Sequence, residues 1–156
     1  MFGNKKAYAR ARAKGYRSGL EVKAAQQLED GGIPFRYEPG PIRYTVPERV
    51  AKYTPDIFLK NGIVIETKGI FSTEDRAKTI LVKNQFPDLD LRLVFSNPNT
   101  RISKQSATTY AAWCESKGIA FAKFPIPAAW IAEPGTPARI KAMVDALGLD
   151  PFLTSK

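Results

Sequence analysis

The chain contains no histidine and only one cysteine among its 156 residues. Without histidine it cannot form a Ser-His-Asp or Cys-His catalytic group or a histidine-ligated zinc site. A single cysteine excludes an internal disulfide and fits a reducing compartment such as the cytoplasm. Because Cys114 lies in the run Tyr110-Ala111-Ala112-Trp113-Cys114, we expect a packed helix residue rather than a nucleophile.

Long apolar runs are also absent, so no segment approaches the length of a membrane span, and we expect no membrane partner. The hydrophobic content of 44% and the length fit one globular domain with a real core. Acidic residues are few, since 15 Asp and Glu stand against 24 Lys and Arg, giving a net charge of +9. Such an excess favours nucleic acid as a partner, through phosphate neutralisation and counterion release.

The positive charge is most concentrated at the start of the chain. The basic residues that precede the first acid, Glu21, are Lys5, Lys6, Arg10, Arg12, Lys14 and Arg17. Tyr8 and Tyr16 are interleaved with them. We expect residues 1–17 to form a flexible arm whose basic residues contact DNA and become ordered on it. The alternative is a solvated tail that only aids solubility.

Two acids flank a predicted hairpin in the middle of the chain. Asp56 follows Tyr53-Thr54-Pro55, and Glu66-Thr67-Lys68 follows the apolar segments 57–59 and 63–65, which Lys60-Asn61-Gly62 joins. A two-residue turn would send Asp56 and Glu66 to opposite faces, whereas a three-residue loop with a left-handed Gly62 places them directly across from each other. We predict the three-residue loop, in which the facing carboxylates share a cation, because without one they would raise each other's pKa and destabilise the fold. Val64, Glu66 and Lys68 then lie on the Asp56 face.

Facing carboxylates suit Mg²⁺, with Mn²⁺ able to substitute, because these hard cations bind a few acids and keep waters. Such an ion can polarise a phosphoryl group and lower the pKa of a bound water, which is the chemistry of phosphodiester hydrolysis. Lys68 can orient or deprotonate the attacking water, or stabilise the pentacoordinate phosphate, and both roles remain open. The alternative is an ordinary hairpin with solvated acids; Pro55, the apolar strands and the basic excess favour the hydrolytic site.

The rest of the chain predicts alternating helices and strands. A Ser18-x-x-Glu21 capping box begins a helix that Gly31-Gly32 ends, and capping alone explains Glu21. Strands are predicted around Phe35 and Tyr37, at 42–46, 91–95 and 119–122, with a polar connection at 47–52. One helix is predicted from Ser72 or Thr73 to before Pro87, with Ala77, Ile80 and Leu81 inward. A second runs from near Ser106 or Thr108 to Lys117, and a brief helical turn is predicted at Trp130. A final helix is predicted over 138–147, with Ile140, Val144 and Leu147 inward. The order αββββαβαβα predicts an α/β fold with one central mixed β-sheet flanked by helices and the acidic hairpin at its centre.

Several co-linear motifs resemble the phage T7-type endonuclease I family, the Holliday junction resolvases of the PD-(D/E)xK nuclease superfamily. The resemblance runs from about Arg17 to Ile131. The motifs are Arg17-Ser18-Gly19-Leu20-Glu21, Tyr53-Thr54-Pro55-Asp56, Gly62-Ile63, Glu66-Thr67-Lys68-Gly69, Asp75-Arg76, Leu93-Val94-Phe95-Ser96, Thr108-x-Tyr110, Cys114-Glu115, Gly118-Ile119 and Ile126-Pro127-Ala128-x-Trp130-Ile131. The resemblance implies a restriction-endonuclease-like core. We therefore expect a basic arm (1–17), a nuclease domain (18–132) and a C-terminal helical extension (133–156).

The resemblance also implies roles for single residues. Glu21, Asp56 and Glu66 would hold divalent ions, the Thr67 carbonyl would complete a metal site, and Lys68 would assist the water, so that Glu21, Asp56, Glu66 and Lys68 form the catalytic set. Outside the arm, the residues expected to contact DNA are Arg76, Arg101 and Lys104. The chain departs from the family at Arg36, where the family carries a glutamate on the strand after the first helix, so an acidic role there is lost or passes to Glu38.

A homodimer is the assembly that the resemblance implies, with elements exchanged across a bridging strand. Glu21 of one chain would then join Asp56, Glu66 and Lys68 of the other, and the extended segment 43–53 suits such a connector. Two sites would place paired nicks in four-way and other branched DNA, recognised by shape and phosphate contacts. The setting implied is a phage-encoded enzyme of DNA recombination in the host cytoplasm. The alternatives are a noncatalytic basic DNA-binding module and a linear-duplex endonuclease with the same site.

Overall fold

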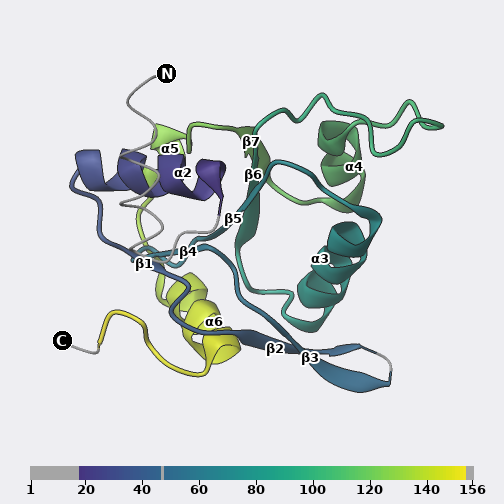
Figure 1. Ribbon diagram of the computed structural model, residues 1–156. Helices are drawn as coiled ribbons and strands as arrows, with labels where there is room; N and C mark the ends of the chain where they lie inside the picture. The colour runs from purple at the N-terminus through teal and green to yellow at the C-terminus, as the bar shows by residue number, and fades with distance from the viewer. Residues whose placement is uncertain (1–17, 47, 154–156) are drawn as a thin grey trace.

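The computed structural model describes residues 18–46 and 48–153. The predicted basic arm, with Lys5, Lys6, Arg10, Arg12, Lys14 and Arg17, lies outside the described residues. The elements, in chain order, are α2 (Gly19–Asp30), β1 (Phe35–Tyr37), β2 (Ile42–Val46), β3 (Arg49–Tyr53), β4 (Ile57–Leu59), β5 (Val64–Lys68), α3 (Thr73–Gln85), β6 (Leu91–Phe95), α4 (Tyr110–Lys117), β7 (Phe121–Lys123), α5 (Ala128–Ala132) and α6 (Pro137–Leu147) (Figure 1). Within the described ranges, no helix combines the length and apolar character needed to span a bilayer.

A five-stranded mixed sheet in the order β1-β4-β5-β6-β7 forms the centre of the fold. β1, β4 and β5 pair antiparallel, and β5, β6 and β7 pair parallel. The predicted α/β class with a central mixed sheet is therefore confirmed, and the acidic hairpin β4–β5 supplies the middle strand. β5 pairs antiparallel with β4 and parallel with β6, and its carboxyl-terminal end leads into the loop to α3.

The prediction of one sheet that includes residues 42–46 was wrong. β2 pairs only with β3, in a separate two-stranded antiparallel ribbon, and the predicted connection at 47–52 is largely strand β3. The buried residues of β3 are Ala51 and Tyr53. Ala51 is small, and the exposed Val50 beside it breaks the alternation of apolar and polar residues, so sequence periodicity did not mark this strand.

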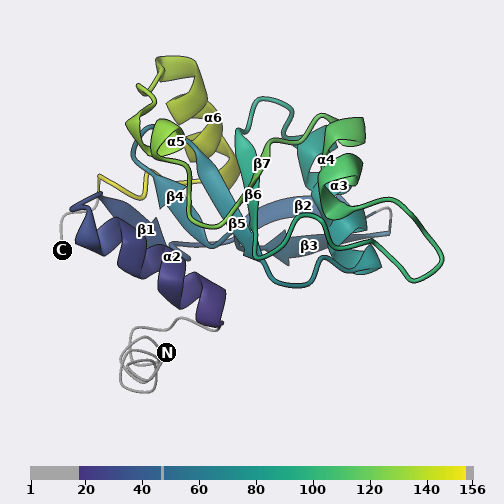
Figure 2. The ribbon, with the colours of Figure 1, turned by 90° about the horizontal axis from the view of Figure 1, so that it is seen from above.

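The alternation of side chains along the strands divides the molecule into layers. Ile57, Ile65 and Val94 face α2, whereas Phe58 and Val64 face the ribbon, α3 and α6. Figure 2 shows the sheet between α2 on one side and the α3–α4 pair on the other. Alternate residues of each strand therefore face opposite layers, and Asp56 and Glu66 lie on the same face of the sheet as Phe58 and Val64.

Side-chain caps set most helix boundaries. Ser18 accepts a hydrogen bond from the Glu21 N–H at 3.1 Å, and Ser72 and Asp75 form a complete capping box at α3. Two predicted boundaries shift, since α4 begins after Thr109 and the following strand occupies 121–123. The prediction that Ala77 points inward was wrong, because Ala77 is exposed and the buried residues of α3 are Thr79 and Val82.

The C-terminal segment packs into the main core. α6 buries Met143, Ala146 and Leu147 in the cluster that holds the inner face of the ribbon. Beyond it, the Arg36 Nε–H donates to the Pro151 carbonyl at 3.2 Å, and the Arg36 guanidinium lies 5.1 Å from the ring centroid of Phe152. Arg36 therefore binds the end of the chain. Cys114 is buried as predicted, and burial raises the pKa of its thiol to about 12.

Candidate active site

The β4–β5 hairpin has the register predicted for a three-residue loop. The Cα partners are Ile57 with Ile65 and Phe58 with Val64. The Leu59 N–H donates to the Ile63 carbonyl at 2.9 Å, and Gly62 closes the loop with φ of 95°. The same register carries Asp56 directly across from Glu66, so the predicted juxtaposition of the two acids is confirmed.

The far end of this hairpin is fixed by the link between α5 and α6. The Asn61 side-chain amide donates to the Trp130 and Glu133 carbonyls, each at 3.0 Å. Its oxygen accepts from the Ile63 N–H at 3.1 Å. The turn is therefore held from outside as well as by its own conformation, which keeps the strands in the register that aligns the acids.

Hydrogen bonds orient the two carboxylates. Asp56 Oδ2 accepts from the Thr67 backbone N–H at 2.9 Å and from the Thr67 hydroxyl at 2.8 Å. Glu66 Oε1 accepts from the Asp56 N–H at 3.2 Å. Asp56 is 6% exposed and Glu66 7% exposed, so both charges are held away from bulk water. Thr67 thus orients Asp56, and the metal-ligand role of its carbonyl stays a prediction.

The electrostatics of the acids favour a cation between them. Burial raises the pKa of Glu66, and the charge of Asp56 raises it further, against the opposing effects of Lys68 and the Tyr53 hydroxyl. Burial likewise raises the pKa of Asp56, although hydrogen bonds from Thr67 oppose the shift. A divalent ion would relieve this repulsion, and an all-oxygen donor set fits Mg²⁺ or Mn²⁺.

Lys68 lies beside the acids, as predicted. Its Nζ is 3.7 Å from Glu66 Oε2 and 3.2 Å from Asp75 Oδ1. Burial disfavours the ammonium, but the carboxylates of Glu66 and Asp75 outweigh burial, so the pKa of Lys68 is raised. Lys68 therefore carries its proton at neutral pH, which suits electrostatic stabilisation of a charged transition state better than removal of a proton from water.

Glu21 reaches the same place from the first turn of α2. Carboxylate oxygens of Glu21, Glu38 and Asp56 lie within 4.8 Å of one another. The Tyr37 hydroxyl donates to Glu21, and the Glu38 N–H donates to the Asp56 carbonyl at 3.1 Å. Glu38 has a positive φ of 42°, a rare conformation for a residue with a side chain. One chain therefore assembles Glu21 with its own Asp56, and Glu38 is the acid on the β1 side of the site.

These residues line a cavity of about 340 Å³. Its lining also includes Lys52 and Lys78, which the sequence did not place at the site. Lys52 is on β3, and the Lys78 Nζ lies 5.7 Å from the ring centroid of Tyr53. Both placements depend on the ribbon folding against α3, for which the sequence carries no local signal.

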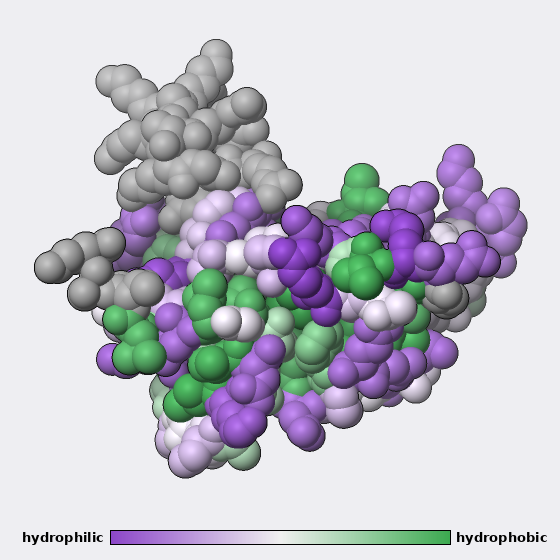
Figure 3. All heavy atoms as spheres, turned by 90° about the horizontal axis from the view of Figure 1, so that it is seen from below, coloured by the Kyte–Doolittle hydropathy of each residue, from purple (hydrophilic) through white to green (hydrophobic). Residues whose placement is uncertain are grey.

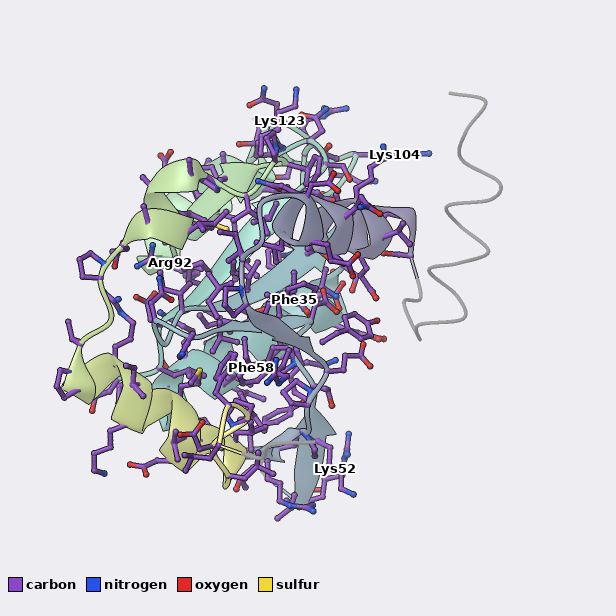
Figure 4. All side chains as sticks on the ribbon, turned by 90° about the vertical axis from the view of Figure 1, so that its left-hand side faces the viewer. Phe35, Lys52, Phe58, Arg92, Lys104 and Lys123 are labelled. Carbon is purple, nitrogen blue, oxygen red and sulfur yellow. The ribbon has the colours of Figure 1, made fainter. Side chains whose placement is uncertain are left out.

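The remaining predicted DNA contacts are not gathered at the cavity. Arg76 donates to the Phe71 carbonyl at 2.7 Å and to the Thr73 hydroxyl at 3.0 Å, so its guanidinium holds the start of α3. Arg101 and Lys104 are exposed on the connection between β6 and α4. Figure 4 shows Lys104 and Lys52 near opposite ends of the molecule, so these cations cannot contact the same few phosphates.

Comparison with known proteins places this arrangement in a family. The profile of phage endonuclease I matches residues 2–147. The chain is 49% identical over 119 residues to endonuclease I of Escherichia phage T7, covering 76% of this chain and 80% of that protein. It is 50% identical over 121 residues to endodeoxyribonuclease 1 of Enterobacteria phage T3, covering 78% of this chain and 80% of that protein.

Proposed function

Because the chain belongs to the phage endonuclease I family, we propose that it is a divalent-metal-dependent endonuclease that resolves four-way (Holliday) and other branched DNA junctions. The observation that best supports this chemistry is the pair of buried acids Asp56 and Glu66, with the Lys68 Nζ 3.7 Å from Glu66 Oε2. This arrangement combines a cation site with a fixed positive charge, and both can promote phosphodiester hydrolysis without histidine.

Each side chain has a distinct part in the proposed reaction. Asp56 and Glu66 would hold Mg²⁺. When bound, this ion would act as a Lewis acid on the phosphate and lower the pKa of a water molecule. Glu21 and Glu38 add oxygen ligands on the α2 and β1 side, where their carboxylates approach Asp56. Lys68 keeps its proton and stabilises the charge that develops on the phosphate oxygens.

The proposed assembly is a homodimer with exchanged elements, acting in the host cytoplasm. β2 ends at Val46 and β3 begins at Arg49, so opening this short connection would convert the ribbon into one continuous strand that crosses to a second chain. Glu21 would then meet Asp56 of the other chain in place of its own. Two sites held at a fixed separation would allow paired cuts on a branched substrate.

The test is cleavage of a radiolabelled four-way junction and a matched linear duplex, with Mg²⁺ or EDTA. We expect Mg²⁺-dependent cleavage of the junction, and a loss of about 10²-fold or more in Lys68→Ala and Glu66→Ala. Lys60→Ala removes an exposed charge at the opposite end of the same hairpin and is expected to cleave like the wild type.

Three outcomes would contradict different parts of the proposal. Equal cleavage of both substrates would remove the preference for junctions and favour a linear-duplex endonuclease. Undiminished cleavage by the Lys68 and Glu66 variants would remove the site assignment. Binding without cleavage in Mg²⁺ or Mn²⁺ would favour a noncatalytic DNA-binding module.

A further inference from the structure

Two positive charges face each other on the ribbon. In the β2–β3 register, Arg43 lies directly opposite Lys52, and both side chains are exposed. Like charges at directly opposed positions of an antiparallel pair destabilise the pair. Within residues 18–46 and 48–153, the ion pairs are made by Lys68, Arg92, Arg139 and Lys141, so neither Arg43 nor Lys52 forms an ion pair there.

Packing does not require these two cations. The opposite face of the ribbon carries the buried residues Ile42, Tyr44, Ala51 and Tyr53, which pack into the core with α3 and α6. Side chains on the outer face contribute nothing to that core, because successive residues of a strand point to opposite sides. The hydrophobic core therefore does not depend on Arg43 and Lys52, and neutral residues could replace them without removing a core side chain.

The outer face is continuous with the candidate active site. Lys52 belongs both to the opposed pair and to the lining of the cavity that holds Asp56 and Glu66. Lys78 lines the same cavity from α3. Figure 4 shows Lys52 on the ribbon, and Figure 3 shows hydrophilic residues around a hydrophobic area on the side of the molecule seen from below. A row of cations thus leads from the cavity onto the ribbon.

We propose that the outer face of the ribbon, through Arg43 and Lys52, binds the phosphate backbone of the DNA arm next to the phosphate that is cut. This inference rests on the proposed nuclease function. A phosphate in the cavity approaches Glu21, Glu38, Asp56 and Glu66, which repel a polyanion, so the adjoining backbone needs compensating cations where it leaves the cavity. Arg43 and Lys52 supply them at the cavity's edge, without reading any base.

The test is binding in EDTA, which separates binding from metal-dependent cleavage. A fluorescently labelled four-way junction is titrated with wild type, with the double variant Arg43→Gln/Lys52→Gln, and with Lys60→Gln/Lys141→Gln, which removes the same charge from exposed sites at the hairpin tip and on α6. We expect the ribbon variant to bind roughly tenfold or more weakly at about 0.1 M salt. Its slope of log affinity against log salt should fall by about 2 for each chain that contacts the DNA. We expect the control variant to bind like the wild type.

A charge-retaining variant separates binding from a structural role. Arg43→Lys/Lys52→Arg is expected to bind the junction like the wild type. Arg43→Gln/Lys52→Gln is expected to melt at the same temperature as the wild type or higher, because the repulsion between the two cations is removed. Wild-type affinity and salt slope in the Gln variant, or equal losses in the Gln and charge-retaining variants, would overturn the proposal. Those outcomes are distinct from failure of the nuclease function, which would appear as no cleavage by the wild type.

Discussion

Glu66 is a residue at which stability and the proposed function oppose each other. It is 7% exposed, and burial together with the charge of Asp56 raises its pKa. A raised pKa in the folded state means that folding prefers the protonated carboxyl, so the ionised form destabilises the fold at neutral pH. The destabilising carboxylate is therefore retained at a position where it can bind a cation.

Removing the charge of Glu66 should therefore stabilise the metal-free protein. In EDTA at about pH 7.5, we expect Glu66→Gln to raise the free energy of unfolding by about 1 kcal/mol, measured by urea denaturation. Because the folded pKa is raised, wild-type stability should increase as pH falls from neutral towards the unfolded value of about 4.3, and Glu66→Gln should flatten this increase. The control is Glu48→Gln, an exposed acid, which should change neither quantity. Lower stability of Glu66→Gln at neutral pH would contradict the argument.

The site residues differ in how far the sequence could predict them. Asp56, Glu66 and Lys68 follow from one hairpin, because loop length and the alternation of a strand fix their relative positions. Glu21 came only from the family resemblance, since capping explained it locally. Glu38 enters the site through the pairing of β1 with β4, a contact between distant segments that local periodicity does not encode.

At the scale of elements, the acidic hairpin depends on its turn. Gly62 has φ of 95°, and a Cβ there would lie 2.9 Å from Arg139 Cγ and 3.0 Å from the Ile140 backbone nitrogen. Arg139 forms an ion pair with Glu133, and its Nε lies 3.2 Å from Asp90 Oδ2. The turn is thus pressed against the start of α6, which explains why the three-residue loop needs glycine for space as well as for conformation.

Gly62→Ala should be markedly more destabilising than the same substitution at a glycine that has a positive φ but free space around it. We expect a loss of about 3 kcal/mol, from the strained φ and from overpacking against the backbone of α6, measured by chemical denaturation. The matched control is Gly118→Ala, where φ is 68° but no atom lies within 4 Å of the added Cβ. The control should lose only about 1 kcal/mol. Equal losses in the two variants would show that the contact with α6 does not matter.

The ribbon shows which elements the sequence could not predict. Strands β1, β2, β5 and β6 carry clear apolar alternation or continuous apolar runs, and each was anticipated within a few residues. β3 presents only Ala51 and Tyr53 to the core, and its other positions are polar or exposed. Its strand conformation comes from pairing with β2 and packing under α3, so the information lies in tertiary contacts.

At the scale of the whole molecule, the described chain completes the candidate site by itself. α2 and β1 bring Glu21 and Glu38 to the Asp56 of the same chain. In the proposed exchanged dimer the same contacts would form between two chains, because exchange replaces each intrachain contact with its interchain equivalent. A single site in one chain and a composite site in two chains therefore predict identical local geometry, so they have to be separated by the oligomeric state and by which mutations complement each other.

Mixing two inactive variants separates these arrangements. If elements are exchanged, a heterodimer of Glu21→Ala and Lys68→Ala has one site with both defects and one intact site, so co-refolding the two should restore nicking of a four-way junction. About half of the dimers formed from equal amounts are such heterodimers, and each can cut only one strand, so we expect single nicks without paired cleavage. The control is each variant refolded alone, which should stay inactive. Sedimentation at micromolar concentration should show a dimer in every sample. A dimer whose mixtures stay inactive would mean that each chain uses its own Glu21, as in the described chain, and a monomer would remove the exchange altogether.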